Sequence, residues 1–168
     1  GSSYFASKGS SMEDALKNFA QLEHKLDSLQ TLGIVKGYTQ TTKLFVPEHI
    51  QQQRIDAWKA YWTSERLDKV RSLICSYAPG AGLNPDGFET FFSMAQADYE
   101  PTHLYEAGII PDGYLSTMLE ETWDGNYLCF TNVQYEGTSD LSEGSNFLNI
   151  CNSVANEPNL MVLHTSYY

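Results

Sequence analysis

Apolar residues recur with the period of an α-helix through most of the first hundred residues. Between residues 12 and 32 they fall at intervals of three and four and line one helix face: Ala15, Phe19, Leu22, Leu26 and Leu29. Ser11 is placed to cap the start of this helix and Gly33 to end it. The same period predicts helix from Glu48 to Ile74, either as one bent helix or as two with Ser64 capping the second, and a further helix after Phe88.

The strand signals concentrate later in the chain. Residues 34–46 are β-branched and interrupted by a glycine, which predicts two short strands or a ragged hairpin. Residues 126–135 form the clearest strand, and Asp124-Gly125 before it is typical of a two-residue hairpin turn with positive φ at both positions. Residues 114–123 fit either a helix or a strand, and we expect them to pair with 126–135.

A helix over residues 147–154 and a terminal strand over 160–168 complete the pattern, with a short helix near residues 101–108. The fold class that fits is α+β, with N-terminal helices packed on a mainly antiparallel sheet formed by the C-terminal half. The length of 168 residues predicts one globular domain over residues 12–168. Residues 1–11 are expected to be a flexible arm or a remnant of an expression vector.

Charge is distributed very unevenly along the chain. The net charge is −11, yet all ten lysines and arginines lie between Lys8 and Arg71, whereas thirteen of the 21 acidic residues follow Arg71. Residues 72–168 therefore carry −13 and residues 1–71 carry +2. We expect an uncompensated negative field over the second half; a charge that only aids solubility is the plainer interpretation. The five cations within residues 54–71 are either a solvated helix face or a basic counter-surface to the acidic half.

The charge and composition disfavour several classes of function. Carboxylates repel the phosphates of nucleic acids and anionic membranes, so we expect neither as a partner. The chain contains no apolar run of the roughly 18 residues that a membrane helix needs. Three cysteines without CxxC spacing favour a reducing compartment, and we expect the cytoplasm.

Candidate chemistry is sparse. His103 and Glu106 would share a helix face, but a plain polar pair is more common than a metal site at this spacing. Cys151 and His164 suggest a thiol–imidazole dyad, but Cys151 falls on the apolar face of its helix. The glycine-rich loop after Tyr77 lacks the nucleotide-binding motifs. We expect no catalytic, cofactor-binding or metal-ligating residues.

The function expected from these features is a non-enzymatic acidic binding module that docks a basic protein surface, as an immunity protein, an inhibitor or a mimic of nucleic acid would. The predicted partner-binding residues are Glu120, Glu121, Asp124, Glu136, Asp140, Tyr114 and Tyr135. One alternative is a small enzyme with a His/Glu site. Another is a self-assembling subunit in which the basic segment 54–71 of one copy meets the acidic half of another, so a homo-oligomer stays possible.

Overall fold

The computed structural model describes residues 1–103, 108 and 118–164. Its contacts divide the chain into two compact units, where the sequence predicted a single domain. Unit 1 combines Gly1–Pro47 with His103–Tyr168, and unit 2 is Glu48–Thr102. Residues 48–102 are thus a helical insertion between the two segments of unit 1.

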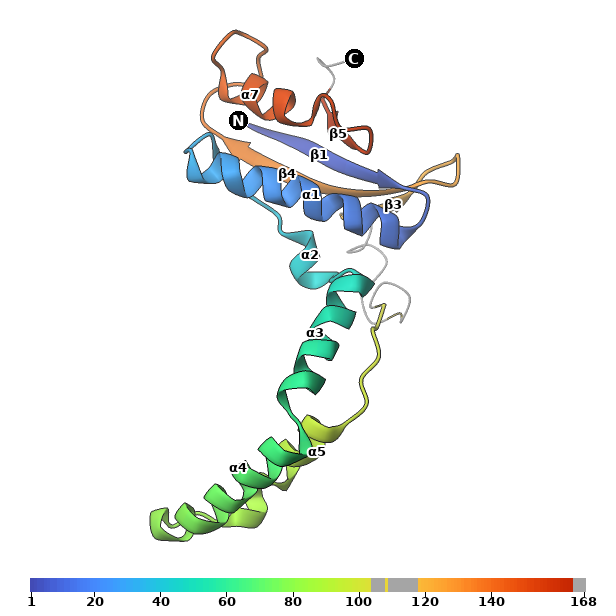
Figure 1. Cartoon of the computed structure of the whole chain (residues 1–168). Coiled ribbons are helices and arrows are strands. Elements are labelled where there is room, and N and C mark those ends of the chain that lie inside the picture. The colour runs from blue at the N-terminus through green and yellow to red at the C-terminus, as the bar shows by residue number, and fades with distance from the viewer. Residues whose placement is uncertain (104–107, 109–117, 165–168) are drawn as a thin grey trace. The chain divides into compact units, whose positions relative to one another are not determined.

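Unit 1 is a layer of helices on an antiparallel sheet (Figure 1). Its elements are β1 Ser2–Gly9, α1 Met12–Thr31, β2 Val35–Tyr38, α2 Thr41–Leu44, β3 Leu119–Glu121, β4 Tyr127–Tyr135, α7 Asn146–Val154 and β5 Leu160–Leu163. Four strands lie in the order β2-β4-β1-β5, and β3 pairs with β4 beside β2. The fold class predicted from the sequence is confirmed.

The connections of unit 1 form two interlocked split β-α-β motifs. Helix α1 joins β1 to β2 with β4 between them, and α7 joins β4 to β5 with β1 between them. This order is the ferredoxin-like arrangement of β-α-β-β-α-β chains. Here it is extended by the short strand β3 and interrupted by unit 2, which is inserted between β2 and β3.

The first residues of the chain form the central strand of the sheet, so the flexible arm expected for residues 1–11 is wrong. Strand β1 pairs antiparallel with β4 on one side and with β5 on the other. Its alternate residues Ser3, Phe5 and Ser7 are buried on the helix-facing side. The sequence reading missed this strand because its small serines and glycines conceal the period-two pattern.

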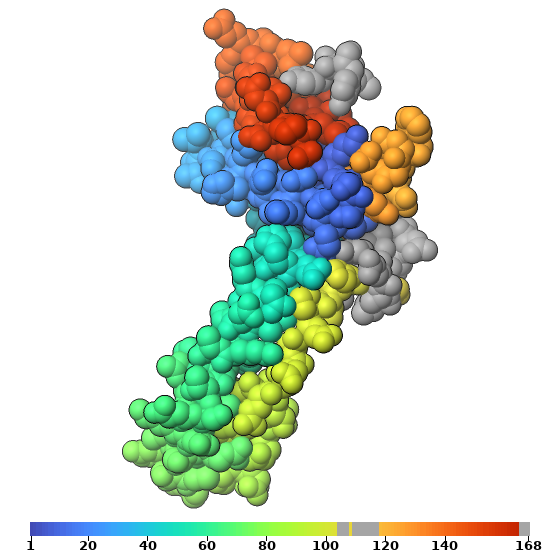
Figure 2. All heavy atoms as spheres, turned by 45° about the vertical axis from the view of Figure 1, so that its right-hand side comes forward, coloured from blue at the N-terminus to red at the C-terminus, as the bar shows by residue number. Residues whose placement is uncertain are grey.

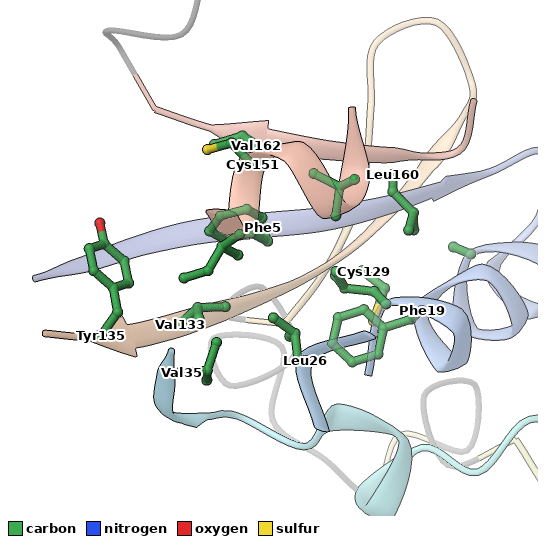
Figure 3. Close-up of a cluster of buried hydrophobic side chains, with 14 of the residues drawn as sticks. Phe5, Phe19, Leu26, Val35, Cys129, Val133, Tyr135, Cys151, Leu160 and Val162 are labelled. Atoms are coloured by element: carbon green, nitrogen blue, oxygen red, sulfur yellow. The ribbon is translucent and has the colours of Figure 1, made fainter. Parts of the chain in front are cut away.

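The core lies between the sheet and the two helices α1 and α7 (Figure 3). Phe5, Phe19, Val133, Phe147 and Ile150 are completely buried there, in side chains drawn from both termini and from the middle of unit 1. Helices α1 and α7 pack against the strands and against each other in this layer.

Several local predictions for unit 1 hold and one fails. The helix over residues 12–32 is confirmed as α1, and the Ser11 side chain accepts a hydrogen bond from the Asp14 amide, as its cap position predicted. Helix 147–154 is confirmed as α7. The hairpin predicted for residues 34–46 is wrong, since β2 is followed by the single helical turn α2. The helix expected near 101–108 lies mostly outside the described residues.

Unit 2 consists of α3 Glu48–Tyr61, α4 Ser64–Tyr77, the 3₁₀ turns η1 Pro79–Ala81 and η2 Pro85–Phe88, and α5 Glu89–Gln96. The alternative of two helices over residues 48–77 is therefore the correct one, and the Thr63 side chain, rather than that of Ser64, caps the second. Its buried cluster is small, with Leu67, Phe92 and Ala95 at the centre.

Candidate protein-binding site

The β3–β4 hairpin ends in a tightly hydrogen-bonded turn. The Gly125 amide donates to the Thr122 carbonyl at 3.0 Å, and the Thr122 amide donates to the Asn126 carbonyl at 2.7 Å. Gly125 has φ of 77°, and no other residue of the turn has positive φ. The predicted hairpin is confirmed for the described strands, but the two-residue turn is wrong. Residues 122–126 connect β3 and β4, and the three residues from Trp123 to Gly125 lie within the hydrogen-bonded pair of Thr122 and Asn126, with the glycine in the left-handed conformation.

Asp124 holds this turn together. Its carboxylate accepts hydrogen bonds from the Thr122 hydroxyl and from the Asn126 amide, the latter at 3.3 Å. These bonds, with the Lys8 ammonium 3.7 Å away, lower the pKa of Asp124 to about 2. Asp124 is thus ionised at neutral pH and fixes the conformation of the loop from which its neighbour projects.

That neighbour, Trp123, is the most exposed large apolar side chain of the described residues, with 98% of its surface accessible. The hairpin projects from the surface of unit 1, where Figure 2 shows it in orange. Glu120 and Glu121 precede it on β3 and are exposed as well. Neither glutamate forms an ion pair within the described part of the chain. We call Glu120, Glu121, Trp123 and Asp124 the acidic hairpin tip.

The remaining predicted carboxylates lie elsewhere. Glu136 and Asp140 follow β4, whereas the acidic hairpin tip precedes it. The nine residues of β4 separate the two groups by about 30 Å. An ion pair with Lys36 lowers the pKa of Glu136, and hydrogen bonds from Ser142 and Thr138 lower that of Asp140. Asp140 thus organises its own loop. The structure brings three of the five predicted carboxylates together, and not these two.

Of the two tyrosines predicted as anchors, Tyr135 is buried and Tyr114 lies outside the described residues. Tyr135 is 1% exposed, its hydroxyl is 2.7 Å from the Ser3 hydroxyl, and its ring stacks on Phe147. An anchor for a partner must be accessible, so Tyr135 is corrected from the surface to the core. Sequence reasoning missed Trp123, although an aromatic residue directly before an Asp-Gly turn is a usable signal, because turn positions are exposed.

The acidic half is less isolated than its sequence suggests. Lysines of unit 1 approach three of its carboxylates, in the pairs Lys8–Asp124, Lys25–Glu157 and Lys36–Glu136. Unit 2 pairs Lys59 with Asp98 and Arg71 with Glu89. The expected lack of compensation is therefore wrong for these five carboxylates, since folding brings distant cations beside them. Exposed pairs of this kind contribute little to stability.

The residues considered for catalysis are buried in the fold or contact neighbouring side chains. Cys151 is buried, and burial raises the pKa of its thiol to about 11, which disfavours the thiolate that a nucleophile requires. His103 Nδ1 lies 3.1 Å from a carboxylate oxygen of Glu13, and the His164 ring packs on Phe147. Among the described residues, no three His, Cys, Asp or Glu side chains are grouped to hold a metal ion. Glu106 lies outside them.

Comparison with known proteins gave no relative. No family model, no curated protein and no solved structure matches this chain. Within the described residues, no helix has both the length and the apolar character needed to cross a membrane.

Proposed function

We propose that the chain is a protein-binding module whose acidic hairpin tip docks a basic protein surface. Trp123 is the anchor that enters an apolar recess of the partner, and Glu120 and Glu121 face lysines or arginines around that recess. Immunity proteins, inhibitors and mimics of nucleic acid belong to this functional class. The cysteines form no disulfide, which is ordinary in a reducing compartment such as the cytoplasm, where we place the complex.

The observation that carries the proposal is the 98% exposure of Trp123. Tryptophan is among the residues most enriched at the energetic centres of protein interfaces, and leaving its ring in water is costly. The hydrogen bonds of Asp124 order the backbone of the turn before a partner arrives, so less backbone conformational entropy is lost on binding.

Glu120 and Glu121 add a preference for basic surfaces to the apolar anchor Trp123. They lie on the strand that leads into the turn, and no cation within the described residues neutralises them. Complementary charge raises association rates and selects against acidic docking surfaces. The partner surface is therefore expected to be basic with an apolar centre, and binding is expected to weaken as salt rises.

Affinity capture with matched variants tests this function. The wild-type chain and the variant Trp123→Ala are immobilised, extracts of the producing cells are applied at low salt, and bound proteins are eluted with a salt gradient. Wild type is expected to retain a protein with a basic docking surface, for which Trp123→Ala has lost about 30-fold in affinity, equivalent to about 2 kcal/mol for an interfacial tryptophan.

Two matched comparisons provide the controls. Leu141→Ala is the control for Trp123→Ala, and Glu143→Lys is the control for Glu121→Lys. Leu141 and Glu143 are exposed in unit 1 but lie outside the hairpin. Leu141→Ala and Glu143→Lys are expected to bind like wild type, whereas Glu121→Lys is expected to bind more weakly. A column on which wild type and Trp123→Ala retain the same proteins, or retain nothing, contradicts the proposed function.

A further inference from the structure

Helix α4 carries an exposed stripe that combines positive charge with large apolar side chains. Arg66, Lys69, Leu73 and Tyr77 follow each other at intervals of three and four residues, so they share one face of the helix. All four are exposed, Leu73 by 49% and Tyr77 by 73%. We call these four residues the α4 stripe.

The cations of the α4 stripe are not used by the ion pairs of unit 2. Within the described residues, neither Arg66 nor Lys69 forms a salt bridge. The Arg66 guanidinium lies 4.0 Å from the centre of the Tyr61 ring, which is itself 54% exposed. Arg71 differs, because it pairs with Glu89 and lies over the buried Phe92 ring. Arg71 supports the fold of unit 2, whereas the α4 stripe is left to solvent.

The apolar part of the stripe belongs to a unit with very little core. Helix α3 buries none of its side chains and α4 buries only Leu67. A helix of this length is only marginally stable in water without tertiary packing, and a unit of this size buries a smaller share of its surface than a larger domain does. A surface that covers Leu73 and Tyr77 would supply apolar burial that unit 2 lacks.

The acidic hairpin tip matches the α4 stripe in both charge and apolar character. Within the described residues, Glu120 and Glu121 lack an ion pair, as do Arg66 and Lys69, so the two charges of each surface are complementary. Trp123 likewise matches the exposed Leu73 and Tyr77. We propose that the partner is a second copy of this chain, with the acidic hairpin tip of one copy docked on the α4 stripe of the next. This inference rests on the proposed function and names its partner.

The two surfaces are different, so the contact is heterologous. Each copy offers one acidic hairpin tip and one α4 stripe, and every copy can bind two neighbours. Such a contact produces a closed ring if the rotation between copies closes, and an open filament otherwise. The local attraction between the two surfaces acts against the repulsion between copies that each carry a net charge of −11, and this attraction depends on Arg66 and Lys69.

Sedimentation velocity over a wide range of concentration measures this directly on the full chain. The wild type is expected to grow beyond a monomer as concentration rises. Trp123→Ala, and separately the double variant Arg66→Glu with Lys69→Glu, are each expected to raise the concentration of half-assembly by about 30-fold.

Mixing the two variants is the decisive step. Trp123→Ala keeps its α4 stripe and the double variant keeps its hairpin tip, so together they can form one contact but no second one. The expected product is a 1:1 dimer that neither variant forms alone. The double variant Lys17→Glu with Lys43→Glu changes the net charge equally at exposed lysines outside both surfaces, and is expected to assemble like wild type.

A wild type that stays monomeric at every concentration, or variants that fail to dimerise when mixed, overturns the second copy as partner. The proposed function has a separate test. It still stands if the affinity capture retains a protein other than this chain through contacts that depend on Trp123. Circular dichroism and thermal melting of each variant confirm that the fold is intact, as expected for substitutions at exposed side chains.

Discussion

Glu23 is a carboxylate whose surroundings oppose its charge. It lies on α1 and accepts hydrogen bonds from the hydroxyl and the amide of Thr42, at the start of α2. Burial is the largest influence and raises the pKa of Glu23 above its ordinary value of 4.5, although the Thr42 hydrogen bonds act in the opposite direction. The folded chain therefore holds this proton more tightly than the unfolded chain does.

This shift gives stability a defined dependence on pH. The contribution of protonated Glu23 is fully present below pH 4.5 and is lost as pH rises through the raised pKa. Glu23→Gln removes the titration while keeping an oxygen that accepts from Thr42. Its free energy of unfolding relative to wild type is expected to be larger at pH 7 than at pH 4, as measured by urea denaturation. An equal difference at both pH values for Glu23→Gln would contradict this account.

Burial also separates the aromatic residues around the hairpin. Tyr135 and Trp123 belong to the same pair of strands and have similar apolar bulk, yet one is 1% and the other 98% exposed. Strand register buries Tyr135, because it places this side chain against α7. The position of Trp123 in the turn leaves its side chain exposed. A sequence shows that both rings are near a hairpin, but not which of them enters the core.

At the scale of elements, the end of β1 and the first turn of α1 approach each other closely. A Cβ atom at Gly9 would lie 2.2 Å from the Ala15 amide nitrogen and 2.6 Å from the Asp14 carbonyl carbon. Both are backbone atoms of α1, so neither can move aside without shifting the helix. Glycine is required here by close approach of the backbone.

Gly9→Ala is accordingly expected to destabilise the chain by about 1–3 kcal/mol, the usual cost of overpacking a core. Gly37→Ala is the matched control, because a Cβ atom there meets nothing within 4 Å. Thermal or urea denaturation of the two variants gives the comparison. A Gly9→Ala protein as stable as Gly37→Ala would show that α1 does not pack on β1 as described.

At the scale of the whole molecule, the two units differ greatly in how much they bury. Helix α1 of unit 1 buries Ala15, Leu16, Phe19, Leu22 and Leu26. Helix α3 of unit 2 buries none of its residues, and the cluster of unit 2 is centred on three side chains. Regions with few buried apolar contacts open at lower free energy than the core.

Native-state hydrogen exchange is expected to report this difference. In the Trp123→Ala variant, where self-association is weakened, amides of α3 are expected to exchange well before those of α1, β1 and β4. In assembled wild type, amides of α4 are expected to gain protection while those of α3 change less. Equal protection of α3 and α1 in the variant would contradict a thinly packed unit 2.

The sequence by itself determined those elements whose signals are local. The period of three and four over residues 12–32, the cap at Ser11 and the aspartate–glycine turn before β4 all act within a few residues, and each identified its element. The α+β class followed from them. The length of the turn was predicted wrongly, because the number of residues in a loop depends on how the two strands are paired.

Only the tertiary structure decided what depends on residues far apart in the chain. Residues 2–9 became the central strand because β4 and β5, more than a hundred positions later, supply hydrogen bonds on both sides. The same long-range pairing brought Lys8 to Asp124 and Lys36 to Glu136, which a count of charges along the chain could not foresee. It also buried Tyr135 and left Trp123 in solvent, because strand register, rather than residue type, determines which side of a sheet a ring occupies.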